Sequence, residues 1–173
     1  MATITAKDVA ELRAQTGLGM MDCKKALVEA EGDVEKAVKI LREKGMATAE
    51  KKAGRIAAEG RVDILTENGV TAMVEVNSET DFAAKSDTFK EFVTGLLKTI
   101  IAKRPANVEE LMAMNYENTD ETVQKTLIEK IAMIKENLQI RRFVVVEGIT
   151  STYIHGFGST GVIVKFDTDV ANK

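Results

Sequence analysis

The sequence predicts an α+β protein, in which an antiparallel sheet carries helices on one face. The hydrophobic period changes from about 3.6 residues to 2 near residue 60 and returns to 3.6 over roughly residues 86–136, before further strand-like runs follow. Strands arranged in hairpins on either side of a helical block are typical of helices packed against an antiparallel sheet. The 173 residues leave room for one medium domain or two small ones.

Three short helices are predicted in the first 45 residues. Thr5 can cap the first helix, with Asp8 in the capping-box position. We expect Met21 to point inward from the second helix and Gly45 to end the third. A bundle of this size is near the lower limit for independent folding, so we expect it to be marginal and to contact something. The basic linker over residues 47–60 shows no core face.

A β-hairpin opens the second part of the chain. The runs RVDIL and VTAMVEV flank Asn68-Gly69, the strongest short signal for a two-residue hairpin turn. Ser86 can cap a helix that ends before the only proline, and two more helices are predicted over residues 107–114 and 120–136. The strand-like runs IRRFVVVEG and TYIHGF come next, and TGVIVKF is expected to return antiparallel.

The composition argues against a nucleic-acid or membrane partner. With 45% hydrophobic and 29% charged residues the chain can bury a core and stay soluble, and its net charge of −3 is unsuited to neutralising phosphates. The basic pairs Lys51-Lys52 and Arg141-Arg142 lie among acidic residues, which favours a solvated mixed surface. No apolar run approaches the roughly 20 residues of a membrane span, the start resembles no signal or transit peptide, and a single cysteine suits a reducing compartment. We expect a cytoplasmic protein.

One large apolar ring occurs where the fold does not need it. The stretch EVNSETDFAAKSD ends a strand and leads into a helical pattern, so Asp81 and Phe82 are expected at a loop tip. Loop tips are usually polar because water must satisfy their backbone. Met20 and Met21 raise a related question, because adjacent residues cannot both point into one helical core. An exposed Met is an adaptable partner contact, and local packing of both is the alternative.

Enzymatic and cofactor chemistry is not predicted. The run GFGSTG, residues 156–161, matches the dinucleotide fingerprint, but a strand follows it instead of a helix, which favours a hairpin turn. Cys23 and His155, the only thiol and the only imidazole, are formally a nucleophile pair. Cys23 falls in the predicted bundle and His155 in the predicted sheet, which favours a half-buried structural role for Cys23. One His with one Cys cannot build a typical zinc site. His155 remains open between a functional residue and an ordinary strand residue.

Several motifs, in this order, resemble the elongation factor Ts family. They span roughly residues 4–166 and read ELRAQTGLGMMDCKKAL, EVNSETDFAAK, NLQIRR, YIHG and GVIVKF. The resemblance implies an N-terminal ubiquitin-associated-like three-helix bundle and an α+β core of two related halves. On this basis we expect a docking module with its linker over residues 1–54, a first core subdomain over 55–140, and the opening strands of a second, incomplete subdomain over 141–173.

The resemblance also implies a function. Members of the family are guanine-nucleotide exchange factors in translation elongation, which bind GDP-bound and nucleotide-free elongation factor Tu and need no cofactor or metal of their own. Thr80, Asp81 and Phe82 match the family's Thr-Asp-Phe motif, which reaches the partner beside its magnesium site. His155 matches a histidine on the phosphate-loop side. The residues that match the docking positions of the N-terminal module are Arg13, Met20 and Met21. The alternative is a shortened module that holds elongation factor Tu without efficient exchange.

Overall fold

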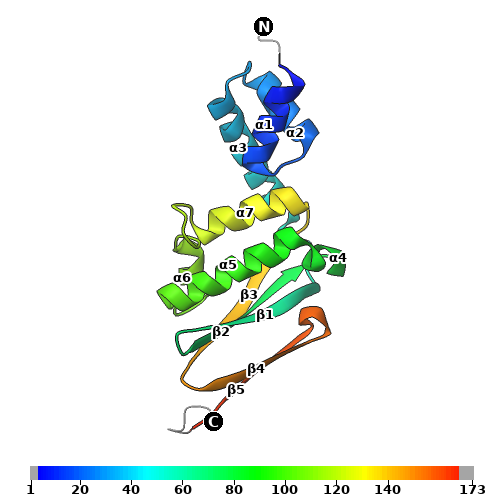
Figure 1. Cartoon of the computed structure of the whole chain (residues 1–173). Helices are drawn as coiled ribbons and strands as arrows, with labels where there is room; N and C mark the ends of the chain where they lie inside the picture. The colour runs from blue at the N-terminus through cyan, green and yellow to red at the C-terminus, as the bar shows by residue number, and fades with distance from the viewer. Residues whose placement is uncertain (1–3, 168–173) are drawn as a thin grey trace.

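In the computed structural model, which describes residues 4–167, a three-helix bundle stands at one end of the molecule and a two-stranded hairpin at the other (Figure 1). Between them, a layer of helices covers one face of a three-stranded antiparallel sheet. The predicted α+β class is confirmed.

The bundle consists of α1 (Ala6–Thr16), α2 (Met20–Glu29) and α3 (Val34–Lys52). The capping box at the start of α1 is present: the Thr5 hydroxyl accepts from the backbone N–H of Asp8 at 3.3 Å, and the Asp8 carboxylate accepts from that of Thr5 at 2.8 Å. The inward positions are apolar and fully or almost fully buried; they include Leu12, Cys23, Ala26, Leu27 and Ala37.

Two expectations for the bundle are wrong. Met21 is 60% exposed, because Cys23, Ala26 and Leu27 take the inward positions of α2. Gly45 does not end α3, which continues to Lys52 through the segment expected to be a linker. Gly45 is buried where α3 meets α7 (Val123–Ile134), and a β carbon added there would lie 3.5 Å from that of Ala132. This is an ordinary contact distance, so Gly45 lies inside the helix at the crossing and does not mark a helix end.

The central sheet has the order β1-β2-β3, with β1 at Glu59–Glu67, β2 at Val70–Ser78 and β3 at Gln139–Glu147. Glu67 pairs with Val70, so Asn68 and Gly69 form the predicted two-residue turn, both at positive φ. β3 pairs antiparallel with β2, with one register shift between Glu75 and Val76.

The main core lies between this sheet and α5 (Asp87–Lys103), which Ser86 caps as predicted. Alternate residues of β2, among them Ala72, Val74 and Val76, are fully buried in this core. The apolar face predicted for α5 is equally buried at Phe89, Phe92, Leu96 and Ile100. The short helices α4 (Asp81–Lys85) and α6 (Val108–Ala113) and the longer α7 complete the layer. α7 begins three residues later than expected, after the cap residue Thr122.

A separate hairpin packs on the opposite face of the sheet. It consists of β4 (Thr150–His155), the 3₁₀ turn η1 (Gly156–Gly158) and β5 (Thr160–Lys165). The hydroxyls of Thr71 and Thr150 lie 2.6 Å apart across the two sheets. The GFGSTG run therefore connects two antiparallel strands, and the interpretation as a hairpin turn is confirmed.

Candidate partner-binding site

Phe82 lies on a small projection at the end of β2, which we call the knuckle (residues 78–85). The expected loop tip is the first turn of a short helix, α4, whose N-cap Thr80 accepts from the backbone N–H of Ala83 at 3.2 Å. Ala83 and Ala84 are buried, whereas Phe82 is 84% exposed. The alanines attach the helix to the core while the ring points into solvent.

The knuckle is held by the segment between α7 and β3, through contacts that sequence reasoning missed. The Glu136 carboxylate accepts from the backbone N–H of Thr80 at 3.0 Å and from its hydroxyl at 2.7 Å. Glu79 accepts from the backbone N–H of the buried Asn137 at 2.6 Å, and Asn137 donates in turn to the carbonyl of Arg55 at 2.7 Å. The hydrogen bond from Asn137 holds the pKa of Glu79 below its usual value. We call these contacts the clamp.

Asp81 is already paired in the free protein. Its carboxylate accepts a hydrogen bond from Lys85, one turn further along α4, and this bond and its charge lower the pKa of Asp81. The carboxylate is therefore ionised at neutral pH. A cation or N–H donor on a partner has to compete with Lys85 for it.

His155 ends β4 at the tip of the hairpin and is exposed. Its Nδ1 lies 3.0 Å from the hydroxyl of Tyr153, and the two rings are 6.0 Å apart at their centroids. This bond orients the imidazole and leaves Nε2 available. Cys23 is fully buried in the bundle, at the other end of the molecule from the hairpin (Figure 1), so the structure does not bring the Cys-His pair together.

The three expected docking residues are all on the surface of the bundle. Arg13 is exposed in the last turn of α1, and Met20 and Met21 are 46% and 60% exposed at the start of α2. Local packing of both methionines is therefore wrong. The exposed bundle residues, the knuckle and the hairpin tip lie at three separate places on the surface of residues 4–167 (Figure 1), an arrangement that suits a large partner better than a small ligand.

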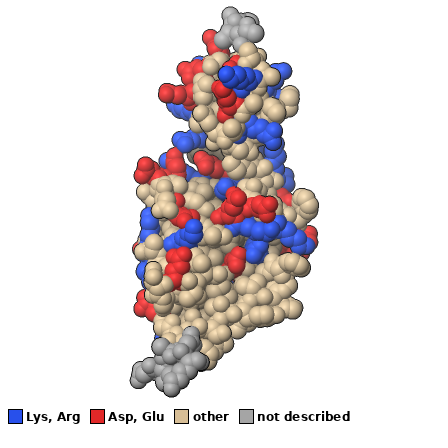
Figure 2. All heavy atoms as spheres, in the orientation of Figure 1, with Lys and Arg blue, Asp and Glu red and all other residues tan. Residues whose placement is uncertain are grey.

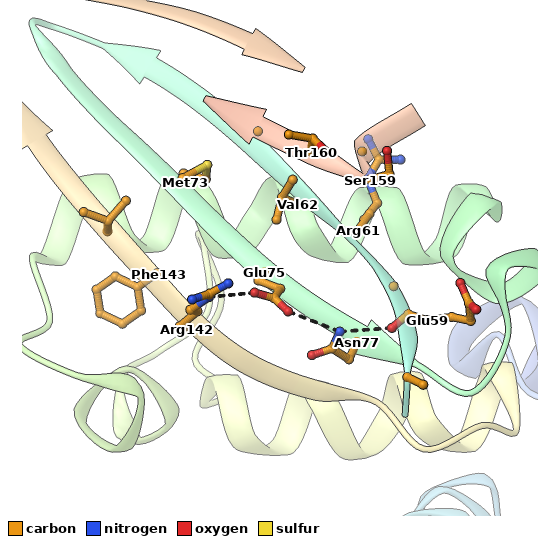
Figure 3. Close-up of a pocket in the computed structure, with 15 residues that line it drawn as sticks. Glu59, Arg61, Val62, Met73, Glu75, Asn77, Arg142, Phe143, Ser159 and Thr160 are labelled. Atoms are coloured by element: carbon orange, nitrogen blue, oxygen red, sulfur yellow. Dashed lines mark hydrogen bonds and ion pairs between the residues drawn. The ribbon is translucent and has the colours of Figure 1, made fainter. Parts of the chain in front are cut away.

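A hollow lies on the face of the sheet that turns away from the helices, between β1, β2, β3 and the hairpin tip (Figure 3). It has a volume of about 660 Å³. Among its polar groups, Arg142 donates to Glu75 at 2.7 Å, and Asn77 donates to the carbonyl of Glu59 at 3.0 Å. Nothing in this lining resembles an acid–base or nucleophilic pair.

The surface carries no single-sign charge field on the face seen in Figure 2. Basic and acidic side chains are interleaved over the bundle and the helical layer, and the hairpin end of this face has few charges. Among residues 4–167, no three His, Cys, Asp or Glu side chains gather as a metal ion would require. No helix in that range is both long and apolar enough to cross a membrane.

Comparison with known proteins gives the family. A family model described as elongation factor TS matches residues 79–173. Relatives named elongation factor Ts come from Syntrophotalea carbinolica (51% identical, over 95% of this chain and 55% of the relative), Trichlorobacter lovleyi (51%, over 98% and 56%) and Clostridioides difficile (50%, over 98% and 57%). This chain thus spans a little over half the length of the relatives it matches. It belongs to the elongation factor Ts family.

Proposed function

We propose that this chain is a translation elongation factor that promotes release of GDP from elongation factor Tu, in the cytoplasm and without a cofactor, nucleic acid or membrane. One observation carries the proposal: Phe82 is 84% exposed on a helix whose next two residues are buried and whose cap residue, Thr80, is bonded to Glu136. A rigidly presented apolar ring is what a protein needs in order to insert into a partner.

The ring acts on the metal side of the nucleotide. A GTPase holds GDP partly through Mg²⁺, which bridges phosphate and protein oxygens in near-octahedral geometry and tolerates distortion badly. Phe82 inserts between elements of elongation factor Tu and shifts its magnesium ligands, with Thr80 and Asp81 fixing the approach. No covalent bond is broken, so the chain is an exchange factor and not an enzyme.

One ring is not enough for fast exchange. Burying a Phe side chain contributes about 1.5–3 kcal/mol, whereas a thousandfold acceleration requires about 4 kcal/mol. His155 supplies a second contact, on the phosphate side, through its available Nε2. Arg13, Met20 and Met21 dock the bundle on the GTPase domain and add affinity. By linkage, GDP weakens binding of the factor by the same ratio as the factor weakens binding of GDP.

The test is release of a fluorescent GDP from elongation factor Tu, with and without this chain. We expect the release rate to rise with the concentration of the chain and to saturate. Because the chain spans little more than half the length of its relatives, the second candidate is a module that binds without exchange. Direct binding with an unchanged release rate would assign that role. Absence of binding would overturn both.

A further inference from the structure

Phe157 carries the most exposed of the large hydrophobic side chains among residues 4–167, at 87%. It also has a left-handed backbone, with φ 57° and ψ 30°, between Gly156 at φ 57° and Gly158 at φ 98°. A bulky residue with a β carbon adopts this conformation only at a cost, whereas Gly and Asn adopt it readily. The turn would be easier to form without the ring, and the ring packs into no core.

The turn that bears this ring is fixed in place. A β carbon added to Gly158 would lie 2.9 Å from both the β carbon of Arg61 and the carbonyl oxygen of Val62, so the turn rests directly on β1. The backbone N–H of Ser159 donates to Gly156 at 3.2 Å, and its hydroxyl donates to the carbonyl of His155 at the same distance. In Figure 3, Ser159 lies beside Arg61 at the rim of the hollow described above.

The turn and the knuckle lie at the same end of β1. Ser78, the first residue of the knuckle, pairs with Glu59 at the start of β1, and η1 rests two and three residues further along, at Arg61 and Val62. Both α4 and η1 pack against β1. In Figure 1 the α4 helix and the turn between β4 and β5 accordingly lie on the same side of the molecule. Two exposed rings, Phe82 and Phe157, thus flank one edge.

We infer that Phe157 is a second apolar anchor, which docks into a hydrophobic pocket on the same GTPase that receives Phe82. The inference rests on the proposed function and deepens it. The partner is one protein that spans the edge, because the two rings flank the same end of β1 on rigid supports. Docking of Phe157 also holds His155, two residues before it, against the partner, so Phe157 is a positioning residue as well as a contact.

Three variants of the full chain test the inference. Phe157→Asn removes the ring and suits the positive φ, so we expect an unchanged or raised melting temperature and a dissociation constant for nucleotide-free elongation factor Tu that rises about tenfold or more. Phe157→Tyr keeps the ring and should bind like the parent. Val164→Ala, on the same hairpin with a side chain 47% exposed, is the matched control and should also bind like the parent.

A fourth variant reports on the ring position itself. The chain has no tryptophan, so Phe157→Trp introduces a single indole, whose emission should shift to the blue when elongation factor Tu is added, after subtraction of the partner's own emission. If Phe157→Asn binds elongation factor Tu with the affinity of the parent while Phe82→Ala still binds more weakly, this inference is overturned and the proposed function stands. A fall in melting temperature with unchanged affinity would assign the ring to packing within the protein and would equally overturn it. If the parent chain does not bind at all, the proposed function fails as well.

Discussion

At the scale of single residues, Phe82 is the side chain whose removal separates function from folding. Its ring is 84% exposed and touches little, so Phe82→Ala should change the free energy of unfolding by less than about 0.5 kcal/mol. The loss of an apolar anchor should lower the second-order rate constant of GDP release by about thirtyfold, equivalent to about 2 kcal/mol. The control is Val28→Ala, which truncates an exposed apolar side chain on a different helix, α2. An unchanged release rate would remove Phe82 from the site.

Glu136 should matter to the site without touching the partner. Glu136→Ala deprives the Thr80 N–H and hydroxyl of their shared acceptor. The knuckle should then loosen, so that amide hydrogen exchange speeds up over residues 79–83 and GDP release slows several-fold. Glu129→Ala, with the same charge change on α7, is the matched control. Faster amide exchange with full activity would mean that the knuckle does not need to be rigid.

Phe82 and His155 should respond differently to magnesium. If Phe82 acts at the magnesium ion of elongation factor Tu and His155 at the phosphate, then removing free Mg²⁺ has the same effect on GDP release as Phe82. It does not substitute for His155. In chelator, Phe82→Ala should lose most of its defect while His155→Ala keeps its own. With magnesium present, the double variant should release GDP more slowly than either single variant. The double-mutant cycle of Phe82→Ala and His155→Ala then gives the coupling energy between the two side chains. Equal rescue of both variants would contradict two separate contacts.

The exposed position of Phe82 could be predicted from the sequence, but the contact of Glu136 that supports it could not. The capping box at Thr5 and Asp8 could be predicted because it is local, and so could the Asn68-Gly69 turn. The bonds from Thr80 to Glu136 join residues 56 positions apart, and no local pattern encodes such a contact. The roles of Arg13, His155 and the Thr80–Phe82 motif remain predictions from the family resemblance.

At the scale of elements, the glycines inside α3 and α5 differ in whether the surrounding packing requires a glycine. In α3, Gly45 faces Ala132 across a distance that would accept a methyl group, so the crossing does not require a glycine, and the helix continues past it. In α5, a β carbon on Gly95 would lie 1.9 Å from the hydroxyl oxygen of Tyr116. That hydroxyl donates to the carbonyl of Phe92 at 3.2 Å, and the two rings stack.

The two glycines therefore give opposite predictions for the same substitution. Gly45→Ala should be neutral or stabilise the protein by up to about 1 kcal/mol, because alanine is the better helix former. Gly95→Ala should destabilise it by about 1–3 kcal/mol, because Tyr116 must leave its position. Chemical denaturation of the two variants side by side measures the difference. Stabilisation by both would mean that Tyr116 can move aside freely.

At the scale of the whole molecule, the bundle is attached to the core through α7. The contact between α3 and α7 at Gly45 is flanked by ion pairs from Asp22 to Lys135 and from Arg42 to Glu121, each with 3.0 Å between nitrogen and oxygen. Exposed ion pairs contribute little on their own. The apolar crossing is thus the contact that sets where Arg13, Met20 and Met21 stand relative to the knuckle.

Displacing the bundle should weaken docking and spare exchange. In Gly45→Leu the added side chain meets Ala132 and Ile128, and α3 has to move away from α7. We expect a several-fold higher concentration for half-maximal GDP release and a maximal rate close to that of the parent, with Gly45→Ala as the control. A collapse of the maximal rate would give the bundle a direct part in exchange.

The clamp sets an order of events during synthesis of the chain. β2 and the Thr80 cap emerge from the ribosome well before β3 and Glu136. Bringing such distant segments together costs loop-closure entropy and places their pairing late in folding. A nascent chain that ends before residue 136 lacks the acceptor of the Thr80 N–H and hydroxyl, so the clamp forms only after the segment that leads into the third strand has been made.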